Sequence, residues 1–122
     1  MARFIYYNQN PDGKKKSDCV TRAISLATGL PYSTIRQKLH YTSKLYECPK
    51  LDVYCYCHLL DDVFKFPRYK CKGMSVGEFA DKHNKGVFLV RMPQHISTIV
   101  DGDCIDIFDC RDYIITHSWR IT

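Results

Sequence analysis

The amino-acid sequence predicts an α+β domain, in which helices come first along the chain and strands fill its last third. Residues 18–46 carry apolar side chains three and four positions apart, the spacing of helices with one buried face. Residues 87–121 instead hold short apolar runs separated by turn residues, which is typical of antiparallel strands. Helices that precede strands, rather than alternating with them, favour an α+β arrangement over a parallel α/β fold.

Length and composition indicate one globular domain over residues 1–122. The chain has 45% hydrophobic residues, no apolar run of the roughly 20 residues that span a membrane, and no signal-peptide core near its start. We therefore expect a cytoplasmic protein without a membrane partner. Seven cysteines, an odd number with irregular spacing, are better explained as reduced thiols than as a disulfide framework.

The helix that begins at Cys19 is the best defined of the helical part. Ser17 can cap its start, Gly29 can end it, and residues 20, 23, 24 and 27 form its apolar face. Three further helices are predicted over Tyr32–Tyr46, Tyr54–Val63 and Val76–His83, the last of them capped by Ser75. Cys19 then lies in the first turn of its helix.

The strands form an antiparallel C-terminal sheet, with one additional short strand at the N-terminus. Their predicted ranges are Arg3–Tyr7, Val87–Met92, His95–Val100, Cys104–Phe108 and Tyr113–Ile121. If the hairpin loop is the three residues 101–103, His95 falls opposite Asp109. A two-residue Asp-Gly turn shifts the register by one and leaves Asp109 diagonal to His95. Either register lets Asp109 orient the His95 imidazole.

Cys19, His95 and Asp109 together have the parts of an activated cysteine nucleophile. A helix N-terminus and a nearby imidazole lower the pKa of a thiol. His95 can take the thiol proton and later protonate a leaving amine, while Asp109 holds the imidazole tautomer. The backbone amide of Cys19 can donate to an oxyanion.

The order Cys, His, Asp along the chain resembles that of the papain-like cysteine peptidase superfamily. The segment HISTIVDGDCIDIFDCRD is similar to the His-strand, hairpin, strand-Asp block of the compact bacteriocin-leader peptidases, and SDCVTRAISLATG to their nucleophile helix. Small papain-fold proteins of phages and mobile elements also resemble it. The resemblance implies a papain-like fold, with the Cys-bearing helix packed on the C-terminal sheet. It also implies a thiol protease or related hydrolase with a catalytic triad, a peptide or protein substrate, and no metal or other cofactor.

The predicted activity is hydrolysis or acyl transfer at a peptide, isopeptide or amide bond. Where the family usually has a Gln before the Cys, this chain has Gly13, so Gln9 or Asn10 is the candidate oxyanion donor. The missing Gln and the carboxylate of Asp18 beside the thiol favour an alternative: an inactive papain-fold protein, phage-encoded, that binds or inhibits a host protein.

Other candidate sites have simpler explanations. A zinc site in the middle segment has the right residue types but no recognised finger spacing, so core packing is preferred for Cys48, Cys55, Cys57, His58 and Cys71. The basic run Lys14–Lys16 is interpreted as a solvated loop, and we expect no nucleic-acid partner. His117 is a second candidate base without an evident carboxylate partner. Cys104 and Cys110 are expected to pack in the core, and Trp119 to cover either the His95 pair or the core.

Overall fold

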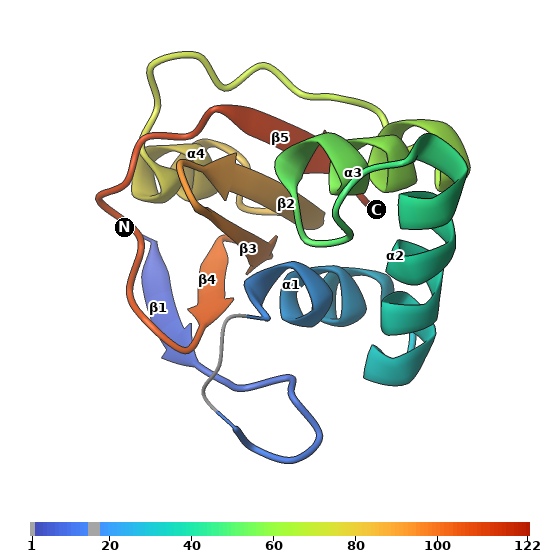
Figure 1. Cartoon of the computed structure of the whole chain (residues 1–122). Helices are drawn as coiled ribbons and strands as arrows, with labels where there is room; N and C mark the ends of the chain where they lie inside the picture. The colour runs from blue at the N-terminus through green and yellow to red at the C-terminus, as the bar shows by residue number, and fades with distance from the viewer. Residues whose placement is uncertain (1, 15–17) are drawn as a thin grey trace.

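A five-stranded mixed sheet with helices on both faces forms the centre of the protein (Figure 1). The structure is a computed structural model that describes residues 2–14 and 18–122. The strands are β1 (Arg3–Tyr6), β2 (Val87–Met92), β3 (His95–Val100), β4 (Asp103–Asp106) and β5 (His117–Arg120). They are ordered β1-β4-β3-β2-β5 across the sheet.

The α+β class is confirmed, but the prediction of an antiparallel sheet is wrong at one edge. β1 pairs parallel to β4, with Arg3 beside Asp103 and Tyr6 beside Asp106, whereas the other neighbouring strands are antiparallel. A parallel neighbour requires a long crossover, and here the chain between β1 and β4 supplies it. A strand pattern near the N-terminus indicates a strand but does not reveal its partner.

The helices begin and end close to their predicted limits. They are α1 (Cys19–Thr28), α2 (Tyr32–Tyr46), α3 (Val53–His58), which continues as the π-helix η1 (Leu59–Val63), and α4 (Val76–Lys82). Gly29 ends α1 in the left-handed conformation with φ 75°, and its N–H donates to the Ser25 carbonyl. Ser75 and Glu78 form a capping box at α4. The predicted cap Ser17, with Lys15 and Lys16, lies outside the described residues.

The sheet separates two hydrophobic cores. α4 covers one face, where Phe79 packs with alternate β2 residues such as Phe88 and Val90. α1, α2 and α3 cover the other face, where Ile24 and Leu89 belong to the second core. The Thr98 hydroxyl donates to the Ala23 carbonyl at 2.8 Å and so fixes α1 against β3. The Cys19 helix is therefore packed on the strand that carries His95.

A two-residue turn connects β3 to β4. Asp101 and Gly102 have φ values of 48° and 84°, as a type I′ turn requires, and Val100 pairs with Asp103. The shorter of the two turns considered above is therefore the one observed. No helix in the described part of the chain has both the length and the apolar content needed to cross a membrane.

Candidate active site

Cys19 is the first residue of α1 and is partly buried where the helix meets β3. The first helical hydrogen bond of α1 runs from the Arg22 N–H to the Asp18 carbonyl, so the Cys19 N–H has no acceptor within the helix. A thiol at this position experiences the positive end of the helix dipole. The predicted placement of Cys19 at a helix N-terminus is confirmed.

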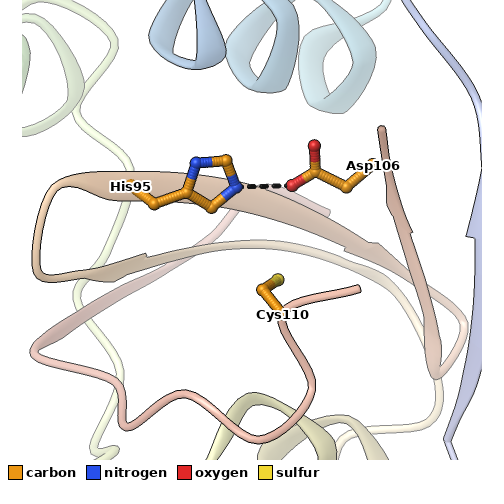
Figure 2. A group of neighbouring side chains, drawn as sticks. All are labelled: His95, Asp106 and Cys110. Carbon is orange, nitrogen blue, oxygen red and sulfur yellow. Dashed lines mark hydrogen bonds and ion pairs between the residues drawn. The ribbon is translucent and has the colours of Figure 1, made fainter. Parts of the chain in front are cut away.

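His95 is paired with Asp106, a carboxylate that the sequence analysis did not select. The two side chains are buried, and Nε2 of His95 lies 2.6 Å from Oδ2 of Asp106. Figure 2 shows this contact, with the second ring nitrogen, Nδ1, directed away from Asp106. Nδ1 is therefore the ring nitrogen that is left to serve the Cys19 thiol.

The expectation that Asp109 orients His95 is wrong. The Asp109 carboxylate is exposed and forms a bidentate pair with Arg111, at 2.8 and 2.6 Å. β4 ends at Asp106, so residue 109 is no longer part of the strand. The ring of Phe108 packs against the His95 ring instead, with centroids 4.4 Å apart.

The error was to keep Asp109 as the orienting carboxylate in both hairpin registers, although the observed two-residue turn favours Asp106. In a strand, a shift of one residue moves every side chain to the opposite face. The three-residue turn would place Asp106 on the face away from His95, whereas the observed register places Asp106 beside Ser97 on the same face as His95. The Ser97 hydroxyl indeed donates to Oδ2 of Asp106 at 2.7 Å. The Asp-Gly pair, which favours a two-residue turn, was the signal that could have found Asp106.

The electrostatics of the site favour a thiolate facing an imidazolium. Burial alone would raise the pKa of Cys19, but hydrogen bonding to His95 and to the backbone N–H of Ile96, with the charges of His95 and Arg22, lowers it below the ordinary value. Burial alone would lower the pKa of His95, but the Asp106 carboxylate and the thiols of Cys110 and Cys19 raise it to about 11. Both shifts act in the direction that a nucleophilic cysteine needs.

Asp18, the expected obstacle to an acidic thiol, is directed toward other groups. Its carboxylate accepts from Arg22 Nε at 2.6 Å, the Tyr32 hydroxyl at 2.6 Å and Asn10 Nδ2 at 2.9 Å. Burial would raise the pKa of Asp18, but these three donors lower it below its usual range. The charge of Asp18 is thus paired with Arg22, and the charge of Arg22 is among the causes that lower the pKa of Cys19.

The two predicted oxyanion donors are differently placed. Asn10 is buried, its side-chain amide donates to Asp18, and it is not among the residues that line the hollow at Cys19. Gln9 lines the same small hollow as Cys19, and its side-chain amide donates to Ser25 Oγ at 3.0 Å. One of the two N–H groups of Gln9 suffices for that bond. Gln9 therefore stays a candidate oxyanion donor, and the Asn10 prediction is not supported by its contacts.

The hollow beside Cys19 is small, whereas a much larger hollow lies elsewhere. The space bounded by Cys19, Gln9 and Arg22 has a volume of about 10 Å³, room for about one water molecule. A shallow groove of about 610 Å³ follows the exposed face of α2. The chemistry of the side chains, and not the size of the hollow, therefore identifies the candidate site.

Among the described residues, one group of side chains brings three metal-ligating atoms together: His95, Asp106 and Cys110 lie within 4.8 Å of one another. Figure 2 shows Cys110 on the other side of the His95 ring from Nδ1. Imidazole, carboxylate and thiolate suit zinc. However, the 2.6 Å separation of His95 Nε2 and Asp106 Oδ2 is the distance of a direct hydrogen bond, shorter than that between two ligand atoms about 2.0–2.2 Å from one shared zinc ion.

The fold separates Cys71 from the other cysteines of the middle segment. Cys55 is buried beside Cys48, and burial and this neighbour raise its pKa to about 12. Cys71 belongs to the core on the face of the sheet that α4 covers. His58 stacks on Tyr46 and contacts Asp62. All seven cysteines are free, and the core-packing interpretation of this segment is favoured over a zinc site.

The remaining candidates belong to the core or to its surface. Cys104 and Cys110 are buried in the core beneath α4, as predicted, although Cys110 also contacts His95. Trp119 is fully buried in the second core, and its Nε1 donates to Asp61. His117 stacks on Trp119, and burial and nearby arginines lower its pKa. His95, rather than His117, interacts with Cys19.

Comparisons of the chain with protein-family models, with curated proteins and with solved structures find no match. The likeness to papain-like peptidases, and any activity it implies, therefore stays a prediction.

Proposed function

We propose that the protein is a thiol-dependent hydrolase or acyltransferase that acts on a peptide, isopeptide or amide bond. The observation that supports this proposal is the chain of contacts from Cys19 to His95 to Asp106. It combines an acidified thiol, an imidazole that contacts this thiol and a buried carboxylate that orients the imidazole. These are the roles that nucleophilic catalysis by cysteine requires.

In the proposed reaction the Cys19 thiolate attacks the substrate carbonyl carbon, and the negative charge moves to the carbonyl oxygen. The Cys19 backbone N–H, and the Gln9 amide if it turns from Ser25, donate to that oxygen. The C–N bond then breaks as the His95 imidazolium protonates the leaving amine, which leaves a thioester. Neutral His95 next takes a proton from water or from an acceptor amine, which attacks the thioester and releases Cys19.

An activated ester tests this proposal without knowledge of the natural substrate. With p-nitrophenyl acetate, the wild-type protein should release many equivalents of p-nitrophenol per molecule, because Cys19 is acylated and His95 promotes its deacylation. The Cys19→Ala protein should show no such turnover. The His95→Ala protein should be acylated at Cys19 and then react no further. A fast reaction that ends at a few equivalents, with acetyl groups spread over several cysteines, would contradict the proposal.

A second candidate, a binding protein without catalysis, is favoured by the shape of the surface. The hollow at Cys19 is about 10 Å³, whereas the groove on α2 is about 610 Å³. The groove is lined by three basic side chains and no acidic one; its lining is Ser33, Arg36, Gln37, His40, Tyr41, Lys44 and Lys50. Such a surface suits an acidic region of a partner protein. Absence of ester turnover in a folded protein would favour this candidate.

A further inference from the structure

The guanidinium of Arg22 connects two buried carboxylates. Nε lies 2.6 Å from Oδ1 of Asp18, and Nη1 lies 3.2 Å from Oδ1 of Asp106. The three side chains are between 4% and 7% exposed. Buried charges are costly unless they are paired, so Arg22 permits both carboxylates to stay ionised inside the protein. With His95 protonated, the four side chains carry two positive and two negative charges.

The two oxygens of Asp106 have different partners. Oδ1 accepts from Arg22 and from the Ile107 N–H at 2.7 Å, while Oδ2 accepts from His95 and from the Ser97 hydroxyl. The donors at Oδ1 determine how the carboxylate is rotated. Because of that rotation, Oδ2 is presented to Nε2 of His95 (Figure 2).

Arg22 is itself held from its other side through Asp18. The Asp18 carboxylate is bound by Tyr32 of α2 and by Asn10 of the loop after β1. Arg22 and Asp18 together thus connect β4 to α2 and to the loop after β1. A lysine could not replace Arg22, since a single ammonium group lacks the planar fork that contacts two carboxylates at once.

We propose that Arg22 is a positioning residue of the Cys19 site: it holds Asp106 in the orientation that His95 requires, and it places a positive charge near the thiolate. This inference rests on the proposed function. It adds Arg22, which lies outside the group of Cys19, His95 and Asp106. Arg22 links the Asp106 carboxylate to α2 and to the loop after β1.

The double variant Arg22→Gln/Asp18→Asn tests the proposal, because it removes the bridge and leaves the net charge unchanged. Two properties are measured: the NMR signal of the His95 Nε2 proton and the apparent pKa of Cys19. The pKa is taken from the pH dependence of thiolate absorbance, after the absorbance of the same protein with Cys19→Ala has been subtracted. We expect the ring-proton signal to broaden or vanish and the Cys19 pKa to rise by about one unit or more.

The matched control is Arg3→Gln/Asp103→Asn, which removes an exposed arginine–aspartate pair between β1 and β4. This control should keep the wild-type ring-proton signal and Cys19 pKa. A folded Arg22→Gln/Asp18→Asn protein with both properties unchanged would overturn the proposal. If that variant does not fold, Arg22→Lys replaces it: loss of the ring-proton signal is expected, and its retention overturns the proposal.

A different result is expected if the proposed function itself is wrong. Cys19 then titrates like an ordinary thiol both in the wild type and in the variants at position 22. The His95 ring proton then still decides the role of Arg22, because that signal depends on the contact with Asp106 and not on catalysis.

Discussion

Replacing Asp106 with Ala should lower the rate of Cys19-dependent ester turnover by about 10²–10⁴-fold, whereas Asp109→Ala should leave it nearly unchanged. The reason is geometric: the buried Asp106 carboxylate lies 2.6 Å from His95 Nε2, while exposed Asp109 is paired with Arg111. Without Asp106 the imidazole loses both its preferred orientation and the charge that stabilises its protonated form.

Stability must be measured alongside this rate, because Asp106→Ala also leaves Arg22 with one carboxylate fewer. Asp106→Asn is the companion variant, since its amide oxygen can still accept from His95 but carries no charge. We expect its rate to fall between those of the wild type and Asp106→Ala. Equal losses in the Asp106→Ala and Asp109→Ala proteins would contradict the assignment of Asp106.

Replacing Trp119 with Ala should destabilise the protein by about 3–5 kcal/mol, the cost usually found for removing a large buried aromatic side chain. Trp119 is fully buried in the core between the sheet and α1, and it donates a hydrogen bond to Asp61. The substitution leaves a cavity on β5 and an acceptor without its donor. Unfolding in denaturant, followed by circular dichroism, measures the loss.

Tyr41→Ala is the matched control for this prediction, because Tyr41 is 72% exposed on α2. Its effect should stay within about 0.5 kcal/mol. A loss below about 1 kcal/mol for Trp119→Ala would mean that the second core does not depend on this side chain.

Local signals in the sequence were sufficient for the helices and for two of the site residues. Gly29 and Ser75 mark helix ends through backbone conformation and capping, which depend on neighbouring residues alone. Cys19 follows from the start of its helix and His95 from the start of its strand. Such features can be predicted because the interactions that create them span only a few residues.

The rest of the site depends on contacts between distant segments. To predict Asp106, the hairpin register must be known to within one residue, because a shift of one residue places its side chain on the opposite face of the strand. Arg22 contacts Asp106 across 84 positions of sequence, and no local pattern distinguishes it from a surface arginine. The parallel pairing of β1 with β4 was missed for the same reason, since a strand pattern does not identify its neighbour.

The pH dependence of alkylation at Cys19 tests the proposed thiolate–imidazolium pair most directly. The rate at each cysteine is followed by mass spectrometry in the wild type and in His95→Ala. Because His95 lowers the pKa of Cys19, the wild-type rate at Cys19 should reach half its maximum well below pH 8.5 or so, the ordinary value for a thiol. In His95→Ala the midpoint should move up toward that value. A wild-type Cys19 that reacts slowly, with an ordinary midpoint that His95→Ala does not change, would contradict the pair and the activity proposed from it.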